Sequence, residues 1–359
     1  MYKVGYLGSW KRIPEAAAAV YDNDIAKLES LIANGLDINE PVPLDDRTQT
    51  SLLEIAVFQN NITMIRFLLD HGAEIENTEN RPLICSAARF CSPEAVSIIA
   101  KLTKHLKKDK KKSIYECVYW HNNIDCIPAL EQAGFTAAEL GGNAFRQAVF
   151  DDHVDFARLM LEKGVDINFH EPDMVFPYAS TAVIVAARYN KDSIVHWLVE
   201  QGADITISDK YGDRPYTCAL KNKNQELADY LKALEPEDWH NEQEKVRQLK
   251  PYKLPKEMVE YLKTGPYRIE FPEQEYTKWV ELLPYMDLQE VSLKRKKMLS
   301  IMSDMDNYCD YMLLWNPKDK KIWYQDVEHE ELNPLADWKD FIADPGRYLN
   351  GMIDGEFNG

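Results

Sequence analysis

The sequence of 359 residues lacks the local signatures of catalysis and of cofactor binding. It has no glycine-rich phosphate loop, no GxSxG nucleophile elbow and no HExxH zinc motif. Its eight histidines are scattered, and Asp304, Asp306 and Asp310 lack the glycine and the twelfth-position glutamate of a calcium loop. The sequence therefore predicts a protein that is not an enzyme and that needs no cofactor and no metal. An enzyme hidden in the C-terminal part would need a pocket with converging titratable groups, of which the sequence gives no sign.

Long hydrophobic runs and paired cysteines are also missing. No stretch of about 18 apolar residues occurs, so we expect no membrane-spanning helix. The short run from Ala16 to Val20 is followed at once by acidic residues, which argues against a secretory signal. None of the six cysteines forms a CxxC pair, and most fall inside apolar patterns. We therefore expect reduced thiols in the core of a cytoplasmic protein.

The chain has few basic residues relative to acidic ones. Its net charge is −17, of which −9 falls in residues 1–235 and −8 in residues 236–359. Such a surface repels nucleic acid and anionic lipid and favours encounter with a basic protein, although acidity can also serve solubility alone. The one basic run, Lys104 to Lys112, is expected to be a solvated loop or helix end.

What the sequence does contain is an internal repeat. An apolar helix, a short polar break, a second apolar helix and a closing glycine recur along residues 12–235, most clearly from Thr181 to Ile205. Small alanines in the first helix allow close packing, and larger apolar residues in the second fill the layer between copies. About seven copies at a period near ~33 residues are predicted. The glycines, expected to take the left-handed conformation that ends a helix, are Gly35, Gly72, Gly134, Gly164 and Gly202.

This pattern resembles the ankyrin-repeat family, whose signature runs DxxGxTPLHxAA and then xxVxxLLxxGADxN. The copy from Thr181 to Ile205 and the segment from Asp209 to Ala219 match it best, whereas Ser51 to Glu54 replace the TPLH tetrapeptide in another copy. The predicted fold is therefore mostly α. An ankyrin-repeat solenoid of about seven helix-turn-helix repeats spans residues 1–235, and a small α+β domain follows over residues 236–359.

Aligning the copies on their closing glycines shows an aromatic row at the ends of the first, inner helices. Ankyrin arrays use these positions to face their binding groove, and aromatic and arginine side chains often carry binding energy at interfaces. These residues could instead pack between repeats, or the C-terminal domain could fold back over them. The predicted partner-binding residues are Tyr21, Asp22, Phe58, Gln59, Arg89, Phe90, Trp120, His121, Phe150, Asp151, Arg188 and Tyr189.

The C-terminal part has a different composition, rich in aromatics and proline. We expect helices over Pro255 to Lys263, Asp287 to Met302 and Leu335 to Ile342, and strands over Tyr267 to Phe271, Trp279 to Leu283, Tyr311 to Trp315 and Lys321 to Tyr324. The phrases Leu254-Pro255, Glu281 to Val291 and Asp337 to Ile342 resemble the SUKH superfamily of immunity and cell-wall-regulator proteins. Trp315, Trp323, Trp338 and Phe341 are expected in its core.

The two resemblances imply a protein-protein interaction protein. The first hypothesis is a bacterial immunity protein that binds and neutralises a toxin domain, which we expect to be basic because the chain itself is acidic. The alternative is an intracellular scaffold or regulatory adaptor that links a peptide in the ankyrin groove to a second protein. Neither nucleic acid nor a membrane is an expected partner, and a monomer is favoured.

Overall fold

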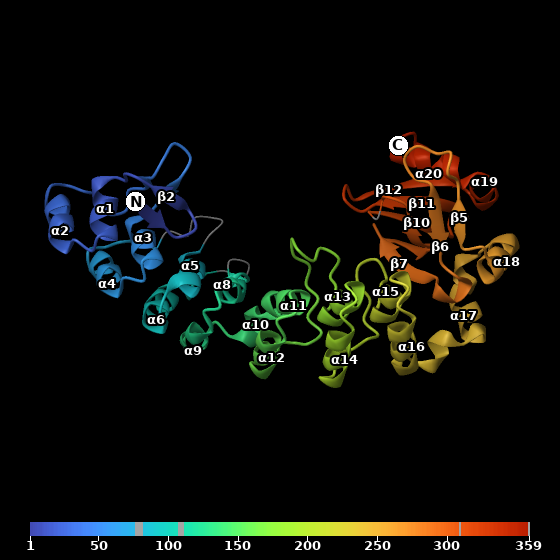
Figure 1. Ribbon diagram of the computed structural model, residues 1–359, viewed down its shortest axis with the longest axis horizontal. Helices are drawn as coiled ribbons and strands as arrows, with labels where there is room; N and C mark the ends of the chain where they lie inside the picture. The colour runs from blue at the N-terminus through green and yellow to red at the C-terminus, as the bar shows by residue number, and fades with distance from the viewer. Residues whose placement is uncertain (76–81, 107–110, 309, 358–359) are drawn as a thin grey trace. The chain divides into compact units, whose positions relative to one another are not determined.

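A computed structural model describes residues 1–75, 82–106, 111–308 and 310–357 (Figure 1). The chain forms two compact units, Met1–Phe169 and His170–Gly359. The domain boundary at residue 235 rests on the change in composition and stays a prediction. Residues 107–110 of the basic run and Cys309 lie outside the described residues. Among the residues that are described, no helix is long and apolar enough to cross a membrane.

The first unit consists mainly of paired helices, preceded by a β-hairpin. The hairpin is formed by β1 (Tyr2–Val4) and β2 (Gly8–Trp10), and a second short strand pair joins β3 (Val42–Pro43) to β4 (Gln49–Thr50). The helices are α1 (Glu15–Tyr21), α2 (Ile25–Ala33), α3 (Leu52–Phe58), α4 (Ile62–Asp70), α5 (Leu83–Phe90), α6 (Pro93–Leu102), α8 (Ile114–Trp120), α9 (Ile127–Gln132) with the short η1 (Ile124–Cys126) before it, α10 (Ala137–Leu140), α11 (Gly142–Phe150) and α12 (Val154–Glu162).

Local signals in the sequence start and end these helices. The side chains of Asp24, Ser51 and Asn61 accept hydrogen bonds from backbone N–H groups three residues later, at 2.9–3.0 Å, which satisfies donors that a helix start leaves unpaired. The five closing glycines have φ between +85° and +96°. The predicted left-handed termination is therefore confirmed.

The inner helices stack directly on one another within this unit: α1 on α3, α3 on α5, and α5 on α8. Fully buried alanines such as Ala17, Ala56 and Ala88 line these contacts, and their small side chains allow the close approach that the repeat pattern predicted. Side chains also connect successive pairs, since Asn123 Nδ2 donates to the carbonyl oxygens of Ala88 and Cys91, both at 2.9 Å.

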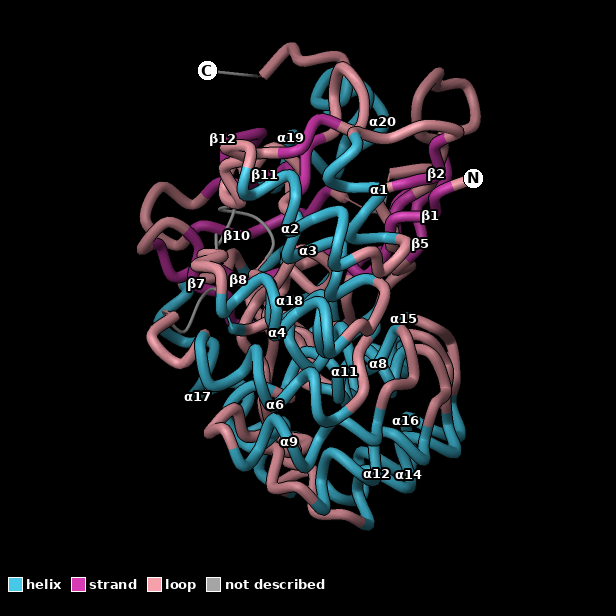
Figure 2. The backbone as a smooth tube through the Cα atoms, turned by 90° about the vertical axis from the view of Figure 1, so that its left-hand side faces the viewer, coloured by secondary structure: helices cyan, strands magenta, loops and turns pink. Residues whose placement is uncertain are grey.

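The second unit joins two further helix pairs to a strand-rich region (Figure 2). The pairs are α13 (Ala182–Arg188) with α14 (Asp192–Glu200), and α15 (Pro215–Lys221) with α16 (Gln225–Leu234). There follow η2 (Glu237–His240), α17 (Glu242–Leu249), η3 (Lys250–Tyr252), α18 (Lys256–Thr264), β5 (Arg268–Glu270), β6 (Trp279–Leu282), η4 (Tyr285–Asp287), β7 (Gln289–Leu293), β8 (Lys296–Ser300), β9 (Met302–Met305), β10 (Tyr311–Asn316), β11 (Lys321–Asp326), β12 (Glu331–Asp337), α19 (Trp338–Ala343) and α20 (Pro345–Ile353).

The strands form an antiparallel five-stranded sheet in the order β12-β11-β10-β8-β7 and a three-stranded sheet in the order β5-β6-β9. Trp315, Trp338 and Phe341 belong to the main core and are at most 4% exposed, as predicted. The Trp315 indole Nε1 donates to the Tyr252 carbonyl oxygen at 2.8 Å. Trp323 is only partly buried and packs on the opposite face of the sheet.

Two sequence predictions in this region are wrong. Residues 287–302, predicted as a helix, form η4 and the β7–β8 hairpin, and Lys294 and Arg295 turn the chain with φ of 46° and 65°. The alternating burial of β7 carries the strand signal, which the following lysine and arginine residues obscured. The predicted helix from Leu335 begins only at Trp338, because β12 extends to Asp337. The β1–β2 hairpin and α20 were not predicted.

The last helix pair packs against the edge of the five-stranded sheet, where α15 lies beside β7 (Figure 1). Gly212, in the loop before α15, makes this possible. A Cβ atom there would lie 3.0 Å from Val291 Cγ1 and 3.1 Å from the Glu290 carbonyl oxygen, and its φ of +86° suits glycine. The strand-rich region is therefore built against the end of the repeats.

Candidate protein-binding surface and a polar cavity

The predicted residues of the first two helix pairs lie under the β1–β2 hairpin. The rings of Tyr21 and Tyr2 pack edge to face at 5.0 Å, and the Tyr2 hydroxyl donates to Asp22 Oδ2 at 3.4 Å. Gln59 Nε2 donates to the Lys3 carbonyl oxygen at 3.2 Å. These inner-helix ends are thus occupied by the chain's own residues.

The tip of the hairpin reaches further, onto the third pair. The Tyr6 ring packs against Phe58 at 5.4 Å and stacks on Phe90 at 6.1 Å, and the two phenylalanines contact each other at 5.5 Å. The Arg89 guanidinium lies 4.9 Å from the centre of the Tyr6 ring, a cation–π distance. We call Phe58, Arg89 and Phe90 the aromatic seat. Phe58 is 7% exposed, and Tyr6 is 38% exposed.

The next predicted pair, Trp120 and His121, is exposed. Trp120 has an exposed fraction of 55% and packs edge to face on Tyr119 at 5.2 Å. The His121 ring lies 5.0 Å from the ring of Phe90. Partial burial, followed by the nearby charge of Arg89, lowers the pKa of His121. Trp120 is the largest exposed ring among the predicted residues of this unit.

Phe150 is half-buried, and Asp151 is held by its neighbours. Asp151 Oδ2 accepts from the Tyr119 hydroxyl at 2.8 Å and from Gln147 Nε2 at 2.9 Å. Burial, and then the bond to Asp151, raise the pKa of Tyr119. Sequence reasoning missed both Tyr119 and Tyr6. The aromatics at positions 2, 6 and 10, with glycines at 5 and 8, were the available hairpin signal for Tyr6.

In the second unit, Arg188 belongs to a buried charged network. Its guanidinium lies 2.5 Å from Asp209 Oδ2 and 3.6 Å from Asp213 Oδ2, and Lys221 Nζ lies 2.7 Å from Asp213 Oδ1. Burial raises the pKa of Asp209, and the Asp213 charge adds to the rise. Burial acts the same way on Asp213, but Lys221 and Arg188 outweigh it and lower its pKa. Arg188 therefore holds the last repeats together.

Tyr189, the neighbour of Arg188, is 54% exposed. Of the twelve residues predicted from the sequence, Trp120 and Tyr189 are the large hydrophobic ones that the structure leaves more than half exposed. The structure thus divides the predicted row: the rings of the first three pairs lie against the hairpin, and single exposed rings stand at the ends of α8 and α13.

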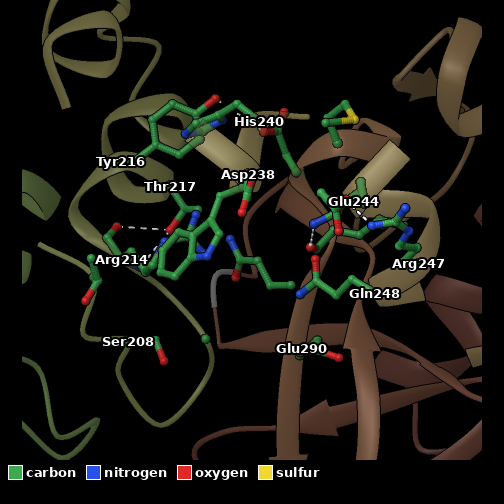
Figure 3. A pocket seen from close by; sticks show the side chains of 18 residues that line it. Ser208, Arg214, Tyr216, Thr217, Asp238, His240, Glu244, Arg247, Gln248 and Glu290 are labelled. Atoms are coloured by element: carbon green, nitrogen blue, oxygen red, sulfur yellow. Dashed lines mark hydrogen bonds and ion pairs between the residues drawn. The ribbon is translucent and has the colours of Figure 1, made fainter. Parts of the chain in front are cut away.

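A cavity of about 740 Å³ lies in the second unit between the last helix pair, α17 and the start of β7 (Figure 3). Figure 3 shows Arg214, Tyr216 and Thr217 on the repeat side and Glu244, Arg247 and Gln248 of α17 on the other. Its size suits a small ligand. The walls are mainly polar and carry both signs of charge.

Glu235, next to this cavity, ties its walls together. Its side chain is fully buried and accepts from Arg214 Nε at 2.8 Å and from His240 Nε2 at 2.9 Å. The Arg214 guanidinium also covers the ring of Trp239, at 4.5 Å from its centre. Glu235, which lies where the composition of the sequence changes, therefore connects the start of α15 to the segment after α16.

Lys245 and Asp287 are two titratable groups of the cavity whose pKa values are shifted. Burial, together with the charge of Arg214, lowers the pKa of Lys245 to about 8, and its Nζ donates to the Leu288 carbonyl oxygen at 2.7 Å. Burial raises the pKa of Asp287, whose Oδ1 accepts from the Tyr216 hydroxyl at 3.4 Å. Across the described ranges, no group of three or more His, Cys, Asp or Glu side chains is arranged to hold a metal ion.

Comparison with known proteins identifies the repeats. Residues 145–241 match the family model for ankyrin repeats, which describes three copies. Over 228 residues the chain is 23% identical to an ankyrin repeat protein of Acanthamoeba polyphaga mimivirus, which covers 61% of this chain. Over 229 residues it is 23% identical to the ankyrin repeat protein YahD of Escherichia coli (strain K12), which covers 62% of this chain.

The extent of these matches differs. The aligned region spans 29% of the mimivirus protein and 97% of YahD. The crystal structure of the human ASB11 ankyrin repeat domain is 19% identical, covering 61% of this chain and 83% of that one with a TM-score of 0.29. The family match and the two sequence relatives agree with the resemblance seen in the repeat pattern: residues 145–241 carry ankyrin repeats, modules that mediate protein-protein interaction.

Proposed function

We propose that this protein binds another protein through the ends of its inner helices. The observation that carries the proposal is the exposure of Trp120 and Tyr189, 55% and 54%, at positions that ankyrin repeats turn to their partners. Trp and Tyr are enriched among the residues that dominate interface energies. An exposed ring of this size gains stabilisation when a partner covers it.

The proposed partner is a basic toxin domain, which the protein binds and neutralises in the bacterial cytoplasm as an immunity protein. The net charge of −17 supports this, because it speeds encounter with a basic surface. The resemblance of residues 236–359 to the SUKH superfamily supports it from the sequence. The function requires occlusion of the toxin and no catalytic group in this chain.

Co-expression with basic toxin domains, taken first from any toxin gene found beside this one, tests the proposal. We expect growth to be rescued and a stable complex to elute in gel filtration. Trp120→Ala and Tyr189→Ala should each weaken the complex about tenfold or more, whereas Val246→Ala, which removes a 49% exposed side chain of α17, should leave it unchanged. Absence of both rescue and complex would reject the immunity role, and capture of an unrelated peptide-bearing enzyme would favour the adaptor.

A further inference from the structure

The β1–β2 hairpin differs in charge from the protein it covers. Residues 1–14 contain Lys3, Lys11 and Arg12 and no acidic residue, in a chain whose net charge is −17. They also carry three large aromatic side chains, of which two donate hydrogen bonds to carboxylates: Tyr2 to Asp22 at 3.4 Å and Trp10 to Asp45 at 3.0 Å. The hairpin thus has the chemistry of a basic, aromatic ligand on an acidic protein.

The hairpin depends on its seat for its conformation. Its strands have three residues each, and an isolated two-stranded hairpin is at best marginally stable in water. Val4 is fully buried, and Gly5 turns the chain with φ of +51° directly on Phe58. A Cβ atom at Gly5 would lie 2.4 Å from Phe58 Cδ1, so the close approach needs glycine.

The aromatic seat has the composition of an interface hot spot. Phe58 and Phe90 form a T-shaped pair under the Tyr6 ring, and Arg89 covers that ring from one side. Arg89 Nη2 contacts Cys117 Sγ at 3.7 Å, while its buried Nε makes no hydrogen bond to any residue in the described ranges. A buried guanidinium N–H without an acceptor is costly, so a ligand that supplies a carbonyl oxygen would be favoured there.

The seat is continuous with the exposed part of the predicted surface. The Phe90 ring contacts the ring of His121 at 5.0 Å, and Trp120 precedes it at the end of α8. A partner that covers Trp120 therefore lies next to the hairpin in this unit.

We infer that the aromatic seat binds a basic turn of the protein partner with an aromatic residue at its tip, and that the hairpin is its internal occupant. This inference rests on the proposed function and names the partner's chemistry at that surface. The Tyr6 side chain marks where the partner's ring is placed. Because the hairpin is tethered, its effective concentration is high, and a free peptide competes with it poorly until the hairpin is released.

A fluorescein-labelled peptide with the sequence of residues 1–14 tests this in trans, by fluorescence anisotropy with the full-length chain. Gly5→Ala should release the hairpin, because its Cβ collides with Phe58 while the seat stays unchanged. We expect the peptide to bind Gly5→Ala at least tenfold tighter than wild type, and Gly5→Ala/Arg89→Ala about tenfold more weakly than Gly5→Ala. A Tyr6→Ala peptide should also bind about tenfold more weakly, and binding should weaken with salt.

Hydrogen exchange first checks that the hairpin is released in Gly5→Ala, as faster exchange in residues 2–10. If wild type and the released variant then bind the peptide equally well, the inference is overturned. If the hairpin stays closed in Gly5→Ala, the Tyr6→Ala variant of the full-length chain provides the released form. Failure of the peptide to bind that variant also overturns the inference. The peptide assay uses no toxin. A toxin complex without peptide binding therefore rejects only this inference, and peptide binding without a toxin complex rejects only the immunity role.

Discussion

Different interactions cover the inner helices in the two units. In residues 1–169 the covering segment is a short hairpin held by aromatic rings and single hydrogen bonds, and its Tyr6 remains partly exposed. In residues 170–359 the inner helix α13 is held through Arg188, Asp209 and Asp213, and α15 is tied onward through Arg214 and Glu235. Contacts made by the partly exposed Tyr6 ring separate at modest cost, whereas separation of buried charges leaves them without partners.

The comparison teaches where a partner can gain access. The hairpin can leave its seat without unfolding the repeats beneath it, because those repeats keep their own alanine-lined contacts. The strand-rich region cannot leave the last helix pair without uncovering Val291 at Gly212 and breaking the hydrogen bond from Tyr216 to Asp287. Four substitutions test this difference, from the largest expected effect on stability to the smallest.

Glu235→Ala should destabilise the second unit most. The substitution leaves Arg214 without its carboxylate in a buried site and also removes the partner of His240. We expect the free energy of unfolding in urea to fall by about 3 kcal/mol or more. Glu330→Ala, which removes an exposed carboxylate paired with Lys210 in the same unit, is the matched control and should have little effect. Equal losses for the two would contradict the structural role of Glu235.

Phe58→Ala should destabilise the first unit by about 3 kcal/mol, because it leaves a cavity under Tyr6 and Phe90. Its urea midpoint should fall. Reduced partner binding by this variant alone would therefore not identify Phe58 as a contact residue. Unchanged stability would show that the hairpin does not bury this ring.

The pH dependence of stability should report Lys245. Its pKa is lowered to about 8 in the folded protein, from an ordinary value of 10.5, so the unfolded chain binds more protons between these pH values. Stability relative to Lys245→Met should therefore rise from about pH 8 to pH 10, by roughly 1–2 kcal/mol. Urea titrations of both proteins across this range measure the rise. A constant difference would show that Lys245 keeps its ordinary pKa in the fold.

Trp120→Ala should change stability least, by less than about 0.5 kcal/mol, because more than half of the ring is exposed. The thermal midpoint should stay the same while the affinity for the partner falls. Thermal melting and gel filtration with the partner, run on the same sample, separate the two effects. A large loss of stability would place this ring in the fold instead.

The repeats could be predicted because their signals are local. The closing glycines act within a few residues, and the structure confirms their predicted conformation from Gly35 to Gly202. The side chains of Asp24, Ser51 and Asn61 act just as locally at the helix starts. The β7–β8 hairpin was misread because Lys294 and Arg295 adopt left-handed turn conformations that are uncommon for such residues. The segment is held by the pairing of β7 with β8 and of β8 with β10.

The candidate surface was harder to predict, for a physical reason. Aligning the repeat copies with one another located the ends of the inner helices. Whether a ring there is exposed, however, depends on segments far away in the chain. Tyr6 lies about 50 residues before Phe58 and covers it, whereas nothing comparable covers Trp120 among the described residues. Arg188 is paired with Asp209 and Asp213, two carboxylates that come from the next repeat. The sequence of the inner helix alone therefore could not predict these ion pairs.

The missing side chain of Gly212 has a consequence for how this protein can be divided. β7 is the outermost strand of the five-stranded sheet, and the loop at Gly212 lies against its Glu290 carbonyl oxygen and Val291 side chain. A fragment beginning at residue 236 would leave that strand with an open edge and an uncovered valine, the condition under which sheets of different molecules join. The last helix pair thus also keeps the sheet from associating with other copies of itself.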